Sequence, residues 1–279
     1  MTKLINRRPD RLQRLVLGAL PFLLVAGLYL WGSEQRLQAN PNDKLLPAPS
    51  KIINTMERLA FEPSKRSGDY LLWTDTAASL QRLALGVSAG ALIGLVFGIV
   101  NGAIPLAHAN FSPMVTTVSL IPPMAILPVL FIIFGLGELA KVVLIVIGIT
   151  PVLIRDLQQR VIEIPREQLI KAQTLGANTW QTIARVILPQ IMPRLLDSVR
   201  LALGPAWLFL IAAEAIAATE GLGYRIFLVR RYLAMDTILP YVVWITLLAF
   251  SLDWILRAVS QRIWPWYHGK SRQQPVATS

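Results

Sequence analysis

Six apolar stretches, each close to the length of one bilayer crossing, divide this chain of 279 residues. About 20 helical residues, at a rise of roughly 1.5 Å each, cross the hydrocarbon core of a membrane. The stretches are Leu15–Trp31, Thr76–Val100, Met114–Gly135, Leu139–Ile154, Leu201–Ala217 and Tyr241–Leu256. The composition agrees, because 54% hydrophobic and 15% charged residues are too apolar for an ordinary soluble surface. We therefore expect an all-α polytopic membrane protein with six transmembrane helices.

The first stretch has the basic flank of a secretory signal peptide, since Arg7, Arg8, Arg11 and Arg14 precede it. Its apolar core is longer than that of a signal peptide, and no small-x-small cleavage site follows it directly. Five further apolar stretches come after it. We expect it to be retained as the first transmembrane helix.

Basic residues concentrate in three segments. Lys and Arg exceed Asp and Glu by four in residues 1–14, by three in residues 155–200 and by four in residues 257–279, which accounts for the whole net charge of +11. Residues 32–75 are balanced, with six basic and six acidic residues. Because Lys and Arg are enriched in cytoplasmic segments, both termini and the 155–200 loop are predicted to be cytoplasmic, and residues 32–75 external.

The external segment contains a further helical pattern. Pro47 and Pro49 mark an extended stretch, after which apolar residues recur at helical spacing. This pattern predicts a short amphipathic helix on the membrane surface. The apolar positions are Ile52, Ile53, Met56 and Leu59.

Glycines recur every four residues in the second stretch. On a helix this spacing leaves a bare groove along one face, where another backbone can approach closely. We predict that these residues serve helix packing. They are Gly86, Gly90, Gly94 and Gly98.

The third stretch contains Pro122, Pro123 and Pro128. Proline lacks a backbone donor and kinks or breaks a helix. The carbonyls that it frees are tolerated at membrane depth only against protein or a water-filled cavity. We predict that this segment lines the translocation path; the alternative is a helix that is merely kinked.

The 155–200 loop holds the most specific local pattern. A helix is predicted after Pro165, a break at Gly176, and a second helix with Asn178 as its N-cap and Gln181 completing a capping box. Gly176 is expected to let the two helices cross closely. Such a pair makes a projecting knob that fits a cleft in another protein, and rigid connection to the next span would pass that partner's motion to the membrane.

The spacing of five residues in this loop is similar to the EAA loop of binding-protein-dependent ABC importer permeases. These residues are Ala172, Gly176, Val186, Leu188 and Pro189. Ile170 and Lys171 replace the first Glu and Ala of that loop, a departure that resembles the nitrate, taurine and alkanesulfonate branch. The segments SLQRLALGVSAGALIGLVFG, LIPPMAILPVLFIIFGLGELAK, AAEAIAATEGLGY and WPWYHG agree with that branch. The resemblance covers about residues 45–268.

The resemblance implies a permease with the MetI-like type 1 transmembrane fold in the bacterial inner membrane. It further implies pairing with a second permease, here expected to be a second copy, together with two cytoplasmic ATPase subunits and an external solute-binding protein. The residues that it implies for ATPase coupling are Lys171, Ala172, Gln173, Gly176, Ala177, Val186, Leu188 and Pro189.

ATP and Mg²⁺ are expected to be used by the partner ATPase subunits, because this chain has no G-x-x-x-x-G-K-[ST] loop. The nearest match, Gly269-Lys270-Ser271, has Trp264 at the first glycine position and follows a span rather than a strand. We expect residues 1–75 to form the N-terminus, first span and external segment, residues 76–258 the transmembrane core with its 155–200 loop, and residues 259–279 a cytoplasmic tail.

Charged residues within the spans need a partner or water. Glu214, placed well inside the fifth span, is predicted to border the translocation path or a gate; the alternative is a structural pair, with Arg82 as its partner, or protonation. Arg82 and Lys141 are expected to snorkel, and Asp253 to anchor the cytoplasmic end of its span. Residues 219–241 are expected outside, where they receive the binding protein or lie on the membrane.

No catalytic, cofactor or metal site is expected in this chain, which has no cysteine and only two histidines. Ser88 and Ser119 have no histidine nearby, and His108 is placed in a short loop. Nucleic acid is excluded because the basic residues are not interleaved with aromatic residues on a polar background.

The expected function is that of a permease subunit in an ATP-driven importer of a small polar solute. The branch suggests nitrate, taurine or another sulfonate, or bicarbonate. The motifs TLGA, FLIAAEAIA and GYRIFLVRRYLAMD also resemble permeases that accompany urea or guanidine carboxylase systems. The alternative is a secondary transporter or channel, for which inverted repeats and more acids within the spans would be expected.

Overall fold

The computed structural model describes residues 9–41, 43–65 and 68–269, and the regular elements within these ranges are all helical. The chain forms two compact units, residues 1–70 with 229–242 and residues 71–228 with 243–279. Lys3, Arg7, Arg8, Lys270 and Ser271, which entered the orientation count and the phosphate-loop comparison, lie outside the described residues.

The first unit contains α1 (Arg11–Ala39) and α2 (Pro49–Phe61). α1 includes the first apolar stretch, and α2 confirms the predicted amphipathic helix. Pro49 stands at the first position of α2, where the missing N–H would have no partner in the helix in any case. The end of α1 holds the segment before α2, because the Tyr29 hydroxyl donates to the Pro47 carbonyl at 2.7 Å and Ser33 Oγ donates to the Leu46 carbonyl at 3.0 Å.

The second unit holds the remaining helices, of which α10 and α11 continue across the boundary between the units. They are α3 (Leu71–Ala103), α4 (Pro105–Ser119), α5 (Pro123–Phe134), α6 (Glu138–Ile162), α7 (Arg166–Thr174), α8 (Thr179–Thr182), α9 (Leu188–Ala217), α10 (Leu222–Arg230), α11 (Met235–Ile263) and α12 (Pro265–Gly269). α6 is the core helix of this unit: Leu144, Ile145, Ile149, Leu153 and Leu157 are all buried.

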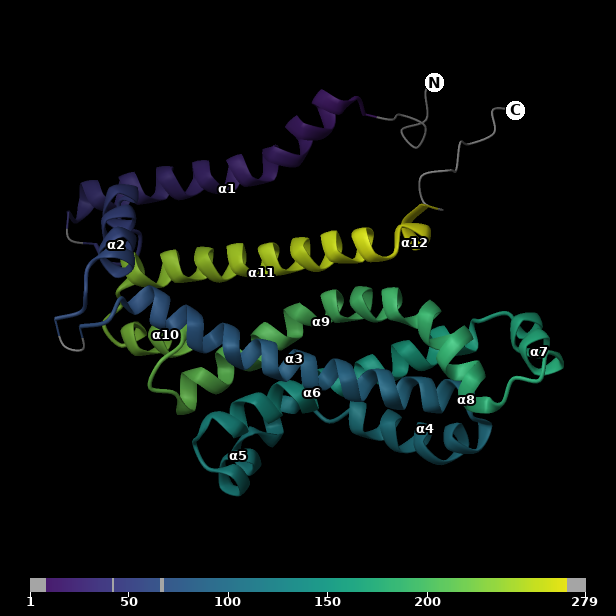
Figure 1. Ribbon diagram of the computed structural model, residues 1–279. Coiled ribbons are helices and arrows are strands. Elements are labelled where there is room, and N and C mark those ends of the chain that lie inside the picture. Colours follow the sequence, from purple (N-terminus) through teal and green to yellow (C-terminus); the bar gives the residue numbers. More distant parts are fainter. Residues whose placement is uncertain (1–8, 42, 66–67, 270–279) are drawn as a thin grey trace. The chain divides into compact units, whose positions relative to one another are not determined.

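α3 lies along α6 (Figure 1), and the regularly spaced glycines of α3 face it. A Cβ atom on Gly86, Gly94 or Gly98 would lie 2.7–2.8 Å from the Cβ of a side chain on α6. Gly90 is also tight, since its Cβ would lie 2.9 Å from two side-chain carbons of Ile149. The bare face of α3 therefore sets the distance between the two helices.

Four helices of the described ranges are long and apolar enough to cross a membrane: α1, α3, α11 and the continuous helix Thr179–Ala217. The pair α4–α5 makes a fifth if it is one broken span. The fourth predicted stretch lies in the buried helix α6 and is not among them. The all-α membrane fold is thus confirmed, whereas the count of six spans is not.

The third predicted stretch is broken rather than gently kinked. α4 and α5 meet at an angle of 95°, with Pro122 as the N-cap of α5 and Pro123 at its first position. α4 begins at Pro105, so His108 lies in a helix and its placement in a loop was wrong. Pro105 accounts for this start, because proline is favoured at the first position of a helix.

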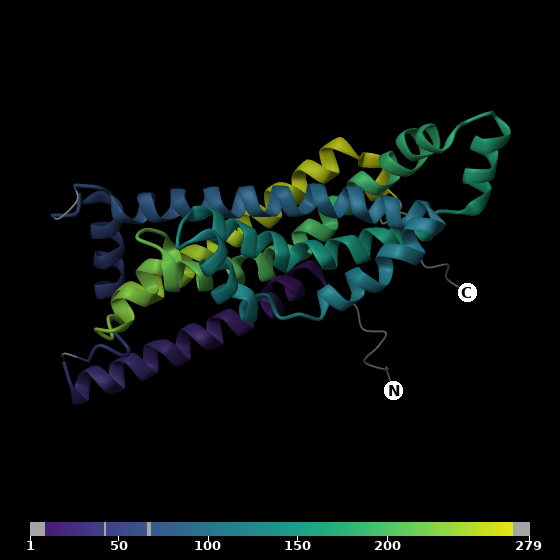
Figure 2. The ribbon, with the colours of Figure 1, turned by 90° about the horizontal axis from the view of Figure 1, so that it is seen from below.

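The 155–200 loop contains the predicted helix, break and helix. α7 ends at Thr174 and α8 begins at Thr179 with the Asn178–Gln181 capping box. α8 continues through a five-residue π turn, Ile183–Ile187, into α9, so that one helix runs from Thr179 to Ala217. Figure 2 shows α7 and α8 projecting beyond the ends of α3 and α6.

Candidate functional site

A polar stripe opens α3 on the same face as its glycines. Asp75, Ser79 and Arg82 follow one another at helical spacing and all three are buried. With residues from α6, α9 and α10 they form what we call the buried charge cluster. Its members are Asp75, Ser79, Arg82, Glu138, Lys141, Glu214 and Arg225. Three acids and three bases balance among them. The Glu138 side chain is 63% exposed, whereas the other members are largely buried, and their pairing reduces the cost of that burial.

Arg82 and Glu214 form the centre of the cluster. Arg82 Nη1 donates to Glu214 Oε1 at 2.8 Å and to the Glu220 carbonyl at 2.9 Å. Ser79 Oγ donates to both carboxylate oxygens of Glu214, at 2.8 and 3.0 Å. Glu214 is 0% exposed, and these donors replace the water that its carboxylate would otherwise bind.

Glu138, the first residue of α6, joins this centre to a second cation. Arg82 Nη2 donates to Glu138 Oε1 at 2.9 Å, and Arg82 Nε also donates to the same carboxylate. Lys141 Nζ donates to Glu138 Oε1 at 2.7 Å. Lys141 is only 2% exposed, so the predicted snorkelling was wrong: a carboxylate one turn away, rather than solvent, satisfies its charge.

The cluster also holds the backbone at the start of α10. The amides of Gly221, Leu222 and Gly223 donate to Asp75 Oδ1, Ser79 Oγ and Glu214 Oε2, each at 2.9 Å. Arg225 closes this arrangement with a 2.8 Å bond from its Nε to Asp75 Oδ2. Side chains of α3 and α9 thus satisfy amides that a helix N-terminus leaves without partners in the helix.

The glycines before and within α10 are required by this close approach. A Cβ on Gly221 would lie 2.6 Å from the Glu214 carboxylate, and one on Gly223 would lie 2.6 Å from the Ile211 carbonyl oxygen. Gly221 also has a φ of +127°, in the region that side chains disfavour. The sequence AATEGLGY therefore encodes a turn that presents three amides to buried acceptors.

The structure alters several expectations about charged residues. Glu214 lies in the last turn of α9, nearer the helix end than expected, and it has the structural partner Arg82. Arg82 is 3% exposed rather than snorkelling. Asp253 pairs with Arg200, at 2.8 Å, as well as standing near the end of its apolar stretch. The sequence reasoning missed Asp75, Ser79 and Glu138, although the spacing of Asp75, Ser79 and Arg82 was a readable signal.

The α7–α8 hairpin, residues 166–182, follows α6 and lies near the end of α3 that is opposite to Arg82 (Figure 2). About 30 Å along α3, at roughly 1.5 Å per residue, separate Arg82 from Ala103. α7 ends in a Schellman motif: the Ala177 amide donates to the Ala172 carbonyl at 3.0 Å, and the Gly176 amide donates to the Gln173 carbonyl at 2.9 Å. Lys171 is exposed in the last turn of α7.

The backbone conformation at position 176 favours glycine. Its φ is +82°, and a Cβ built on it would meet nothing within 4 Å. The expectation that it permits a tight helix crossing was therefore wrong, because no neighbouring atom lies close enough to be crowded. A left-handed residue ends α7 and turns the chain toward Asn178.

Large apolar side chains cover the outside of the hairpin. Ile170, Leu175 and Trp180 are more than half exposed. Val186 lies in the π turn, and Leu188 and Pro189 form the start of α9. Exposed apolar groups on a projecting element fit a surface that is covered by another protein.

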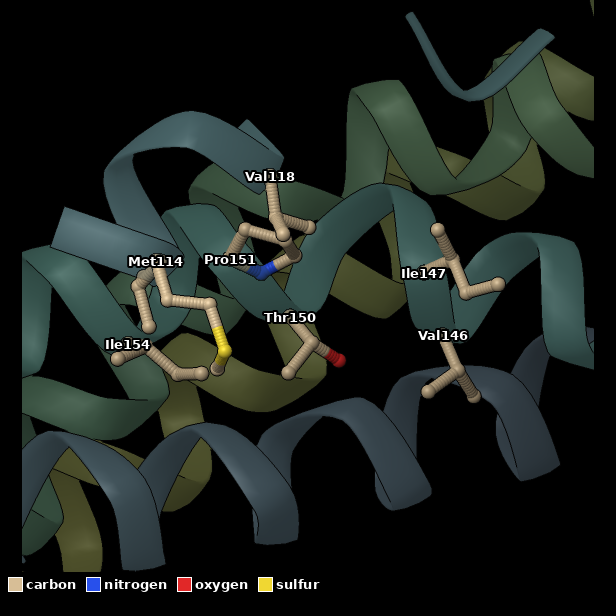
Figure 3. Close-up of a pocket in the computed structure, with 8 residues that line it drawn as sticks. Met114, Val118, Val146, Ile147, Thr150, Pro151 and Ile154 are labelled. Atoms are coloured by element: carbon tan, nitrogen blue, oxygen red, sulfur yellow. The ribbon is translucent and has the colours of Figure 1, made fainter. Parts of the chain in front are cut away.

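Pro122, Pro123 and Pro128 are not among the residues that line the cavity between α4 and α6. A cavity of about 230 Å³ lies between α4 and α6 (Figure 3), with Thr150 as the only side chain in its lining that carries a polar group. Met114 and Val118 of α4 face Val146, Ile147 and Ile154 of α6 across it. Pro122 and Pro128 are exposed and Pro123 is half-buried. An apolar cavity of this kind is unsuited to a charged solute.

Comparisons with known proteins support the same architecture. Residues 86–265 match the family described as binding-protein-dependent transport system inner membrane component. The taurine transport system permease protein TauC of Escherichia coli (strain K12) is 34% identical over 256 residues, covering 92% of this chain and 90% of TauC. The putative aliphatic sulfonates transport permease protein SsuC of Bacillus subtilis (strain 168) is 28% identical over 229 residues, covering 80% of this chain and 78% of SsuC.

A solved structure shares the fold. The inward-facing MetNI methionine ABC transporter contains a chain with a TM-score of 0.63 and 20% sequence identity. The match covers 72% of this chain and 99% of that chain. It supports the MetI-like architecture that the sequence predicts for the transmembrane core.

Proposed function

This chain belongs to the binding-protein-dependent transport system inner membrane component family, and we propose that the solute it passes is a small sulfonate such as taurine. The chain is the permease subunit of an ATP-driven ABC importer. Permeases of such importers work with ATPase subunits and binding proteins, and this chain is not the ATPase. The sulfonate assignment rests on TauC, whose match extends over nearly the whole of both chains.

We further propose that the α7–α8 hairpin faces the cytoplasm and binds an ATPase subunit that uses ATP and Mg²⁺. The excess of basic residues in residues 155–200 supports this orientation, which also places both termini in the cytoplasm. The exposed apolar side chains of the hairpin support a protein partner. The buried charge cluster then lies at the external end, where residues 219–241 are proposed to receive the binding protein.

A single continuous helix supports this coupling role. The helix Thr179–Ala217 begins in the hairpin and carries Glu214 of the buried charge cluster in its last turn. A movement of the hairpin can therefore act on the opposite end of the same helix. We propose that Glu214 contributes to gating by fixing the first turn of α10, whose Gly223 amide it binds.

Reconstituted transport tests the function directly. The permease, its ATPase and its binding protein are placed in proteoliposomes, and uptake of labelled taurine is measured with and without ATP. We expect uptake that requires both ATP and the binding protein. Uptake without ATP would indicate a secondary transporter or channel, whereas ATP-driven uptake of nitrate or bicarbonate, but not taurine, would contradict the proposed solute alone.

Gly176→Val is expected to uncouple the complex. A β-branched residue disfavours the left-handed conformation of this position and would disrupt the turn that ends α7. Gly176→Asn is the matched control, because asparagine adopts this conformation more readily. We expect the valine variant to lose most ATP-driven uptake and ATPase association in pull-down, and the asparagine variant to retain most of both. Equal behaviour of the two variants would contradict the conformational role.

We propose that two copies of this chain form the membrane part of the complex. A single chain provides one α7–α8 hairpin, and therefore one docking element for a pair of ATPase subunits. The mass of the purified complex is expected to correspond to two copies, each of 31.0 kDa, plus the partner subunits. Native mass spectrometry that finds one copy with a different second permease would refute the homodimer.

A further inference from the structure

The join between the hairpin and α9 is not a regular α-helix. In the π turn Ile183–Ile187 the Leu188 amide donates to the Ile183 carbonyl, five residues back. The next residue, Pro189, has no N–H and would bring its ring against the Arg185 carbonyl in a regular α-helix. A π turn widens the helix at this point and so makes room for the proline.

The Gln190 side chain connects this π turn to α7. Its Nε2 donates to the Val186 carbonyl at 2.9 Å and to Gln168 Oε1 at 3.0 Å. The first bond fixes the orientation of the amide, because a backbone carbonyl accepts but cannot donate. Gln190 is half-buried and Gln168 is exposed, so the link lies at the edge of the hairpin.

Gln190 therefore joins α7 to the π turn. Gln168 is on α7, which carries the exposed apolar residue Ile170. Val186 is in the π turn, from which the helix continues to Glu214. A second link, from Arg194 to Glu163 at 3.2 Å, attaches α9 to the end of α6 and does not involve α7.

We propose that Gln190 is the positioning residue that transmits displacement of α7 to α9 through the π turn. This inference rests on the proposed function, in which the hairpin receives motion from an ATPase. A π turn holds one more residue than an α turn, and this irregular turn is a point at which the helix can bend between the hairpin and Glu214. Displacing Gln168 pulls on the carbonyl of that turn through a single amide group.

The test compares variants of similar shape in the complete reconstituted complex. Gln190→Met keeps the size and removes both donors, whereas Gln190→Lys keeps N–H donors for both acceptors. Gln168→Met removes only the hydrogen bond between Gln190 and α7, and Gln168 is exposed. Gln159→Met is the control, because the exposed Gln159 bonds only weakly, at 3.4 Å, to Glu163 of its own helical end.

Two measurements are made on each variant: hydrogen exchange of the α7 amides and the ratio of taurine transported to ATP hydrolysed. Gln190→Met and Gln168→Met are expected to raise α7 exchange and lower the ratio. The expected decrease is about fivefold for Gln168→Met, which loses one ordinary hydrogen bond, and larger for Gln190→Met, which loses two. Gln190→Lys is expected to restore both values.

Different results would contradict the proposed function and the role of Gln190. A wild-type complex without ATP-dependent uptake would contradict the proposed function. Unchanged α7 exchange or an unchanged transport ratio in Gln190→Met, within a complex that does transport, would overturn the role of Gln190. Failure of Gln190→Lys to restore the ratio would also overturn it, because the donors would then not be what matters.

Discussion

Arg82→Met is expected to destabilise the purified permease more than any substitution of an exposed charge. Methionine fills a similar volume but leaves Glu214, which is 0% exposed, without its cation. Removing one member of a buried ion pair typically costs about 3–5 kcal/mol, because the remaining charge is buried without compensation. Thermal unfolding of the detergent-solubilised protein, followed by size-exclusion chromatography, measures the loss.

The second member of the pair provides the decisive comparison. Adding Glu214→Gln to Arg82→Met removes the stranded charge and should recover part of the lost stability. Arg160→Met is the control: Arg160 pairs with exposed acids at 3.5 Å, and such pairs contribute about 1 kcal/mol or less. If Arg82→Met unfolds at the same temperature as Arg160→Met, the ion pair does not stabilise the fold.

Glu214→Gln alone then separates stability from gating. Arg82 retains Glu138 in this variant, so the loss of stability should be smaller than for Arg82→Met. The amide cannot accept all the donors that now meet the carboxylate of Glu214, so α10 should be held less firmly. Reduced uptake by a stable complex would support the gating proposal, and normal uptake with a lower melting temperature would refute it.

Among the four glycines Gly86, Gly90, Gly94 and Gly98, Gly98→Ala is expected to produce the largest effect on the packing of α3 against α6. Its new Cβ would lie 2.7 Å from the Leu157 Cβ and 3.3 Å from the Ile154 carbonyl oxygen, and neither atom can move without the backbone. Overpacking of this kind costs about 1–3 kcal/mol. Gly90→Ala should cost less, because the nearest atoms are the outer carbons of the Ile149 side chain.

Gly204→Ala is the matched control for this series. Gly204 lies within α9, and a Cβ there would meet nothing within 4 Å. Alanine in a helix interior is favoured over glycine by roughly 0.5–1 kcal/mol, so this variant should be as stable as the parent or more so. Equal melting temperatures for Gly98→Ala and Gly204→Ala would show that the seam is not closely packed.

Local sequence patterns predicted the local structures well. The Asn178–Gln181 capping box and the glycine that ends α7 appear where their spacing indicated. These features depend on residues within a few positions of one another, and their chemistry is therefore visible in a short window. The same holds for the break at Pro122, because the effect of proline on a helix is local.

Long-range pairing was predicted only in part. The pair of Glu214 with Arg82, 132 residues apart, was the alternative that the sequence analysis named. The contact of Arg82 with Glu138, 56 residues away, was not predicted, because an apolar window gives no information about such partners. Hydropathy also could not identify α6 as the core of the unit, because burial against protein and burial in lipid both require apolar side chains. The burial of Lys141 was missed for the same reason.

The buried charge cluster also imposes an order on biogenesis. Arg82 is synthesised 132 residues before Glu214, so at about 5–20 residues per second roughly 7–26 s separate the two on the ribosome. During that interval the inserted α3 carries a guanidinium whose final counter-charges have not all been made. Because an uncompensated charge is costly at membrane depth, we expect the nascent chain to keep this end of α3 at the water boundary until α9 supplies Glu214.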